Sequence, residues 1–164
     1  MPYSRTADYV YAFWLIKSVF MSLLVEVPMC FDGADWAANE AKSPIIDFVV
    51  DQVQNVDPLL MEMGPDLQLA TCEHVFLVAP LYGICALAIL AQWQITQRVT
   101  GLFLGPAVFY GMQHYFIMEI WGPLPATDFM AFFWMNIDYI VVPMMIFIRY
   151  AFYNRDDTVK DKQN

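Results

Sequence analysis

Four long runs of apolar residues divide the chain, and each has the length that a helix needs to cross a bilayer. The runs cover residues 9–31, 68–91, 100–121 and 129–153. About 20 apolar residues span the hydrocarbon core of a membrane. Because the backbone in lipid must satisfy its own hydrogen bonds, we expect each run to be a helix. The dyad alternation that a β-barrel requires is not seen in the sequence.

One long polar stretch, residues 32–67, separates the first two runs. It begins with loop-forming residues and continues as an amphipathic pattern. Apolar side chains recur there at helical spacing, opposite Asp47, Asp51, Gln52 and Gln54; they are Ile45, Ile46, Phe48, Val49, Val53 and Val56. The other connections, 92–99 and 122–128, are short and favour antiparallel neighbours. The pattern predicts one all-α domain over residues 1–164, a four-helix transmembrane bundle with an amphipathic helix between helices one and two.

Charge sets the expected orientation. With four spans, both termini and the middle loop share one side, which carries the basic residues Arg5, Arg98, Arg149, Arg155, Lys160 and Lys162. The opposite side has one basic residue, Lys42, and eight acids, which are Asp32, Asp35, Glu40, Asp47, Asp51, Asp57, Glu62 and Asp66. The excess of Lys and Arg marks the cytoplasmic side of a membrane protein. Both termini are therefore predicted to face the cytoplasm, or the matrix if the membrane is mitochondrial.

Composition narrows the class further. Hydrophobic residues make up 59% of the chain and charged residues 15%, with a formal net charge of −9. The negative charge argues against a nucleic-acid partner, because phosphates need a basic surface. The three cysteines, Cys30, Cys72 and Cys85, are odd in number and lie in apolar segments, so they are interpreted as small core residues rather than as a disulfide framework or metal site. No phosphate loop or metal-binding motif occurs, so no cofactor and no metal are expected.

Two acids inside the spans are the strongest candidates for a site, because an ionisable residue in a membrane is costly. Glu26 lies five residues before the end of the first run, and Glu73 five residues after the start of the second. At about 1.5 Å per residue, both lie about 7–8 Å below the same surface. If the two helices are neighbours, the carboxyls meet and share a proton. Such a pair would attract an amine or a hydroxyl on an apolar ligand; alternatively, each acid caps polar groups and binds nothing.

Other polar residues receive structural interpretations. Lys17 is expected to snorkel to the interface, with pairing to Asp138 as the alternative. His114 is interpreted as a core histidine, and Glu119, near a helix end, is expected to reach water. The motif Asp57-Pro58-Leu59-Leu60 is typical of a turn whose aspartate accepts hydrogen bonds from the following amides.

Several of these motifs occur in the order found in a known family. They are the acid Glu26 late in the first helix, Asp57–Leu60, Cys72–Phe76, Pro106-Ala107 with Tyr110, and Tyr139 with Pro143. The whole chain resembles the EXPERA family of sterol-associated membrane proteins, in particular its sigma-2 receptor group. It is more distantly similar to the emopamil-binding protein group, which are sterol isomerases.

The resemblance implies an intramembrane site for a sterol or another lipid. In it Glu26 would pair with a ligand amine, Glu73 would lie protonated beside it, and Asp57 would order the lid. Tyr139 would line the same pocket, and Tyr110 and His114 complete the candidate ligand-binding set. Leu77, Asp51 and Asn136 depart from the receptor pattern, because they stand where it has other residues.

Two other functions are open alternatives. The altered pocket positions favour an accessory structural subunit of a larger membrane complex, for instance in the mitochondrial inner membrane, or a homo-oligomer. A sterol isomerase that recruits Glu73 and His114 is the less favoured enzymatic alternative, since the chain lacks a fifth helix. The ending Lys160-Asp161-Lys162-Gln163-Asn164 is similar to dilysine retrieval signals and, with the resemblance, predicts the endoplasmic reticulum.

Overall fold

The computed structural model describes residues 5–39 and 44–152, and all regular secondary structure in these two ranges is helical. Lys42, Arg155 and the Lys160–Asn164 ending lie outside the described residues. The elements are α1 Arg5–Met21, η1 Ser22–Glu26, α2 Val27–Asp32, η2 Gly33–Asp35, α3 Trp36–Asn39, α4 Pro44–Val56, α5 Pro58–Met61, α6 Pro65–Glu73, η3 His74–Val78, α7 Ala79–Ala91, α8 Gln94–Trp121, α9 Phe129–Asn136 and α10 Asp138–Phe152.

Three continuous helical segments of the described chain are long and apolar enough to cross a membrane. They are Arg5–Asp35, Pro65–Ala91 and Phe129–Phe152. They contain three of the four predicted spans. The fourth, α8, is 28 residues long but is not among them, because polar side chains such as Gln113 and His114 interrupt its apolar surface. The all-helical class is thus confirmed for the described residues, three segments are long and apolar enough to cross a membrane, and the fourth span stays a prediction.

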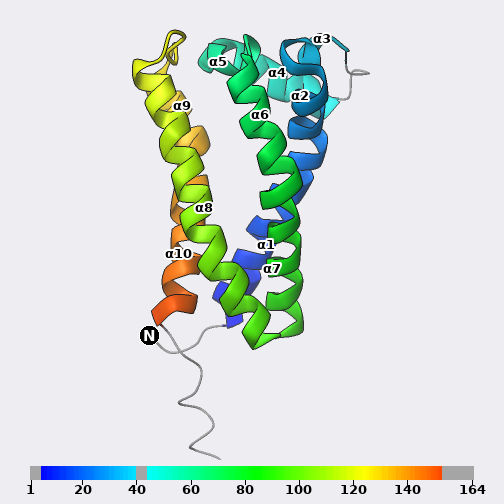
Figure 1. The fold of residues 1–164 in the computed structure, drawn as a ribbon, viewed down its shortest axis with the longest axis vertical. Coiled ribbons are helices and arrows are strands. Elements are labelled where there is room, and N and C mark those ends of the chain that lie inside the picture. Colours follow the sequence, from blue (N-terminus) through cyan, green and yellow to red (C-terminus); the bar gives the residue numbers. More distant parts are fainter. Residues whose placement is uncertain (1–4, 40–43, 153–164) are drawn as a thin grey trace, which may run out of the picture.

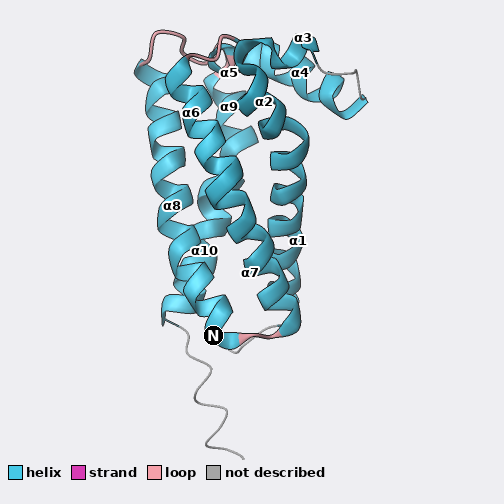
Figure 2. Cartoon of the chain, turned by 45° about the vertical axis from the view of Figure 1, so that its right-hand side comes forward, coloured by secondary structure: helices cyan, strands magenta, loops and turns pink. Residues whose placement is uncertain are grey.

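The long helices form two packed pairs, α1 with α7 and α8 with α10, and α7 packs in turn on α8. The short elements α2–α5 lie at one end of the molecule (Figure 1). The α7–α8 turn and both described chain ends lie at the other (Figure 2). The main core lies where the two pairs meet and includes Leu15, Tyr82, Cys85, Leu104 and Ile146. It occupies the half of the bundle nearest the chain ends.

A two-residue turn connects α7 to α8, which is shorter than the loop expected over residues 92–99. Gln92 adopts a left-handed conformation with φ of 59°, and the Trp93 amide donates to the Ala88 carbonyl at 2.9 Å. The buried Gln97 side chain donates to the same carbonyl at 2.7 Å. The carbonyl of Ala88 near the end of α7 therefore accepts hydrogen bonds from the turn and from the first part of α8, so that α8 can start at Gln94.

The polar stretch between the first two spans forms a helical cap, and its amphipathic helix is confirmed as α4. Ile46, Val53 and Val56 are buried, whereas Asp47 and Asp51 are exposed. Ile46 packs in a second core that is built around the fully buried Trp36. The Trp36 indole N–H donates to the Leu60 carbonyl at 3.3 Å. The acidic end is therefore a folded layer with its own core.

A disulfide joins Cys30 in α2 to Cys72 in α6. The interpretation of both residues as small core side chains is wrong, because the fold brings cysteines 42 residues apart to a Cα–Cα distance of 4.9 Å. Gln68 reinforces the contact by donating to the Cys30 carbonyl at 2.9 Å. Closing a loop of this length stabilises a fold by about 4 kcal/mol in the chain-entropy model. Cys85 is the free, buried cysteine that the sequence predicted.

The contact between α8 and α10 depends on two glycines one turn apart. A Cβ on Gly105 would lie 2.3 Å from the Phe147 Cβ, and one on Gly101 would lie 2.6 Å from the Tyr150 ring. Small residues four apart let membrane helices approach closely and gain van der Waals contact. Gly111, farther along α8, has nothing within 4 Å of the same position.

Gly105→Ala should therefore destabilise the bundle, because the new methyl group forces α8 away from α10. The expected loss is about 1–3 kcal/mol, typical of overpacking a close contact. The measurement is reversible unfolding in mixed micelles with increasing sodium dodecyl sulfate. Gly111→Ala is the matched control and should unfold at the wild-type concentration or above. Equal destabilisation by both variants would contradict the close α8–α10 packing.

The disulfide predicts a simple pattern of thiol labelling. After denaturation without reductant, a polyethylene glycol maleimide should add once, at Cys85; after reduction it should add three times. Cys30→Ser should give two additions without reductant, because Cys72 then loses its partner. Gel mobility reports the number of additions. Three additions to the unreduced wild type would show that Cys30 and Cys72 are free thiols.

Candidate functional site

Two π-helical turns bring the first polar pair together inside the bundle. Glu26 ends η1 on the first span, and His74 begins η3 on the second. The Glu26 Oε2 and His74 Nδ1 atoms lie 2.6 Å apart, and the two side chains are 26% and 25% exposed. Single π-helical turns are rare and occur often at functional sites, because the extra residue redirects side chains.

The predicted Glu26–Glu73 carboxyl pair is wrong. The depth argument placed both residues at one level, but adjacent residues on a helix point about 100° apart. His74 takes the direction toward Glu26, and Glu73 is exposed. No hydrogen bond or ion pair joins Glu73 to Glu26 or to His114 among the described residues. The polar end of the site is therefore a carboxylate and an imidazole.

His74 also contacts Tyr82, whose ring is fully buried. The His74 Nε2 and the Tyr82 hydroxyl lie 3.3 Å apart, and the two rings meet edge to face. With a carboxylate on Nδ1, the neutral imidazole carries its proton there and accepts from Tyr82 through Nε2. The three side chains form a chain from Glu26 through His74 to Tyr82.

A second polar group lies between α1 and α10. Lys17 Nζ lies 2.8 Å from Asp138 Oδ2, and the Trp14 indole donates to the same oxygen at 2.8 Å. The Lys17 ammonium also lies 4.9 Å from the centre of the Tyr139 ring. The favoured expectation, that Lys17 snorkels to the interface, is wrong, and the alternative, that Lys17 pairs with Asp138, is confirmed. Pairing removes most of the cost of holding either charge in the membrane.

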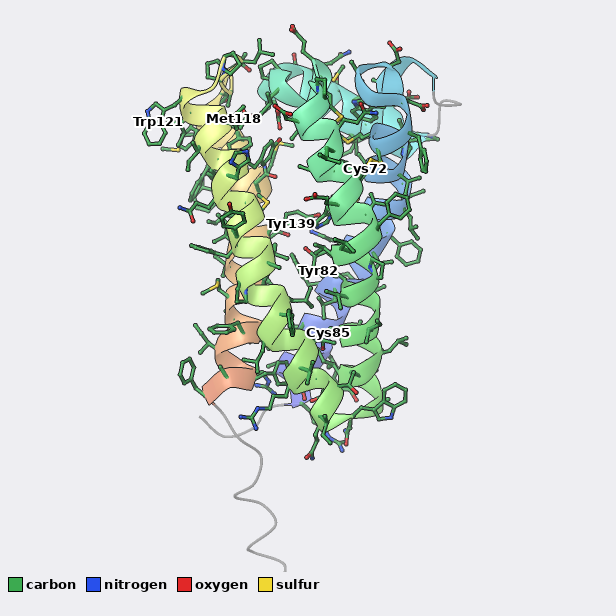
Figure 3. The ribbon with its side chains drawn as sticks, in the orientation of Figure 1. Cys72, Tyr82, Cys85, Met118, Trp121 and Tyr139 are labelled. Atoms are coloured by element: carbon green, nitrogen blue, oxygen red, sulfur yellow. A yellow bond between two sulfur atoms is a disulfide. The ribbon has the colours of Figure 1, made fainter. Side chains whose placement is uncertain are left out.

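Trp14 and two tyrosines connect the two polar groups. Trp14 packs edge to face on Tyr82 at 5.7 Å and on Tyr139 at 5.4 Å. Both phenols interact electrostatically with Glu26 and with Asp138. Figure 3 shows Tyr82 and Tyr139 in the middle of the bundle, between its two halves. Of the predicted set, the fold thus brings Tyr139 into the neighbourhood of Glu26.

Asp57 belongs to a different cluster, at the acidic end. Its Oδ1 accepts from the Leu60 amide at 3.1 Å, as the turn motif predicted, and its Oδ2 accepts from the Tyr115 hydroxyl. Glu119 also interacts with Asp57 and is 1% exposed, so the expectation that Glu119 reaches water is wrong. Burial raises the pKa of Asp57 above its ordinary value near 3.8, against the lowering effect of its three hydrogen-bond partners. Asp57 therefore fastens the cap to α8.

Tyr110 and His114 are not brought to either cluster. Tyr110 is 76% exposed, and His114 is exposed rather than buried in the core. Both lie on α8, whose buried face carries Leu104 and Val108. The pair that the isomerase alternative would recruit, Glu73 and His114, is exposed on two separate helices.

His74 was recognisable as a site candidate in the sequence, although the predicted pair of acids did not include it. An ionisable residue inside a span is a site candidate whatever its type, and His74 is one of two histidines in the chain. Trp14 and Tyr82 gave no such signal, because aromatic residues are common throughout the spans. No cluster of three metal-ligating side chains occurs among the described residues.

No family model, curated protein or solved structure matched this chain. The chemistry of the site therefore rests on its geometry. Glu26 offers one carboxylate with a histidine on one side, in electrostatic range of Tyr82 and Tyr139, and Trp14 packs on both of these rings. Such a site can hold a cation or a hydroxyl group at the polar end of an apolar molecule.

The raised pKa of Asp57 predicts how the cap responds to pH. The folded state holds the Asp57 proton more tightly than the unfolded state, so this stabilisation is present below pH 3.8 and is lost as pH rises through the raised pKa. Asp57→Asn cannot ionise but still caps α5. Between pH 4 and pH 8, the wild type should lose stability relative to this variant. Asp51→Asn, at an exposed site of α4, is the control and should keep the wild-type slope.

Thermal unfolding in detergent, followed by tryptophan fluorescence, measures this effect. Parallel pH profiles for the wild type and Asp57→Asn would contradict the assignment.

Proposed function

We propose that this chain is an integral membrane protein that binds a sterol or a related lipid at the Glu26–His74 site, in the manner of the EXPERA family and its sigma-2 receptor group. The polar head of the ligand, a cation or a hydroxyl, lies at Glu26. The partly exposed ring of Tyr139 packs on its apolar body, and the buried rings of Trp14 and Tyr82 support Tyr139 from inside the bundle. In this proposal α8 is the fourth span.

The partial exposure of paired charges carries this proposal. Lys17 and Asp138 are 40% and 35% exposed, and Glu26 and His74 about a quarter exposed, although each pair bridges two helices of the spans. Lipid tails cannot solvate such groups. A polar ligand group or water must therefore reach them, which is what a binding site provides.

A buried hydroxyl group without a hydrogen-bond partner, on the same helical turn as Glu26, supports the same site. The Ser22 hydroxyl lies four residues before Glu26 in the same π-helical turn and is 1% exposed. Its oxygen has no hydrogen-bond partner among the described residues. Buried polar groups are nearly always satisfied, so an unsatisfied one marks a place for a ligand or water.

Charge and redox chemistry support one orientation. The Cys30–Cys72 disulfide lies at the acidic end, and disulfides persist on the oxidising side of a membrane. The basic residues Arg5, Arg98 and Arg149 belong to the opposite end, where the positive-inside rule places the cytoplasm. Both criteria support a cap on the oxidising side of the membrane and termini in the cytoplasm, as in the endoplasmic reticulum location that we propose.

Glu26→Gln tests the proposal directly. The probe is a dansyl-labelled alkyl trimethylammonium, added at pH 8 to protein in phosphatidylcholine nanodiscs, and cholesterol is tested as competitor. The variant should weaken probe binding about 10- to 100-fold, because it removes a charged partner. Glu62→Gln, an exposed acid of the cap, is the matched control and should bind like the wild type. Equal binding by the wild type and Glu26→Gln, or no displacement by cholesterol, would overturn the proposal.

A second candidate is an accessory subunit of a larger membrane complex, such as one of the mitochondrial inner membrane. The exposure of Glu73 and His114 on membrane helices favours it, because a partner helix could satisfy both groups. Purification from native membranes in mild detergent separates the candidates. Two results together would favour the accessory subunit. Partner proteins would co-purify in stoichiometric amounts with the wild type but not with Glu73→Gln, and the Glu26→Gln variant would bind the probe as well as the wild type.

A further inference from the structure

We propose that His74 is a proton switch for the ligand site, so that a cationic headgroup at Glu26 and a proton on His74 exclude each other. The proposal rests on the proposed function, since it concerns the same site, and it adds regulation by pH. It predicts a protein that holds cationic ligands at neutral or alkaline pH and releases them in an acidic compartment.

The hydrogen bonds around His74 suit both of its protonation states. In the neutral state Nδ1–H donates to Glu26, and Nε2 accepts from the Tyr82 hydroxyl. In the protonated state Nε2–H donates instead, and the Tyr82 oxygen accepts it. A phenol can act as donor or acceptor. The switch therefore requires only rotation of the Tyr82 hydroxyl group, and both imidazole nitrogens of His74 keep a hydrogen-bond partner in either state.

The net charge of the site follows from this one proton. Lys17 and Asp138 cancel each other within their ion pair. Glu26 then gives the site a charge of −1 when His74 is neutral and 0 when His74 is protonated. A cation in a medium of low dielectric constant needs an uncompensated counter-ion. Only the neutral state of His74 supplies one.

The other titratable groups around His74 do not replace it as the group whose protonation neutralises Glu26. Those packed on the site from other elements are Lys17 of α1, Glu26 of η1, and Asp138 and Tyr139 of α10. On its own helix, Tyr82 is its hydrogen-bond partner and Glu73 is exposed. From α8, Tyr115 and Glu119 interact with Asp57, and Tyr110 and His114 are exposed. Glu26 is thus the carboxylate that a His74 proton neutralises.

The chain contains two histidines, His74 and His114, which allows a matched experiment. The dansyl trimethylammonium probe carries a permanent charge, so only the protein titrates. Its dissociation constant is measured in nanodiscs from pH 8 to pH 5. In the wild type it should rise about tenfold for each pH unit once His74 is mostly protonated, the slope of one exchanged proton. His74→Gln keeps an amide donor for Glu26 but cannot ionise, so its binding should not change with pH.

His114→Gln is the control and should keep the wild-type slope. An equal slope in His74→Gln and the wild type would overturn the switch. Calorimetry at pH 6, in two buffers of different ionisation enthalpy, gives a second readout: probe binding should release protons from the wild type and from His114→Gln. Absence of proton release from the wild type would overturn the switch even if His74→Gln does not fold. Probe binding that requires Glu26 at pH 8 but does not vary with pH would reject the switch and leave the proposed function intact.

Discussion

The cost of an isolated charge in hydrocarbon organises the interior of this protein. Lys17 is held by Asp138 and Glu26 by His74, and each pair bridges two different helices. Removing one member of a buried ion pair strongly destabilises a protein, whereas an intact pair is tolerated. Apolar side chains gain little when they move from lipid to the interior of a membrane protein. The polar side chains therefore fix which faces of α1, η3 and α10 point inward.

The two halves of the bundle are held by different interactions. Near the chain ends, Gly101 and Gly105 let α8 approach α10, and the apolar core around Leu15 and Ile146 is tight. Toward the acidic end, α6 buries no side chain and the contacts are polar pairs, aromatic edges and the Cys30–Cys72 disulfide. The half near the chain ends thus depends on close apolar packing, whereas the half beneath the cap depends more on polar pairs and a covalent bond.

Local sequence signals predicted the features that depend on near neighbours. The amphipathic helix α4 and the Asp57 cap on Leu60 follow from spacing and turn chemistry within a few residues, and both are confirmed. The features that failed depend on residues far apart in the chain. Glu119 is covered by the Asp57 cluster, and the contact of Lys17 with an aspartate 121 positions away was only the less favoured alternative in the sequence.

The sequence by itself determined that the described chain is helical, with segments apolar enough to cross a membrane, because length and hydropathy are properties of each segment alone. It also predicted that Glu26 and Glu73 lie at one level, because helical rise depends only on the number of residues. Only the tertiary structure decided which neighbour Glu26 meets. The physical reason is that depth depends on the number of residues, whereas direction depends on rotation. The two π-helical turns, η1 and η3, change the rotation of their helices and turn His74, not Glu73, toward the carboxylate.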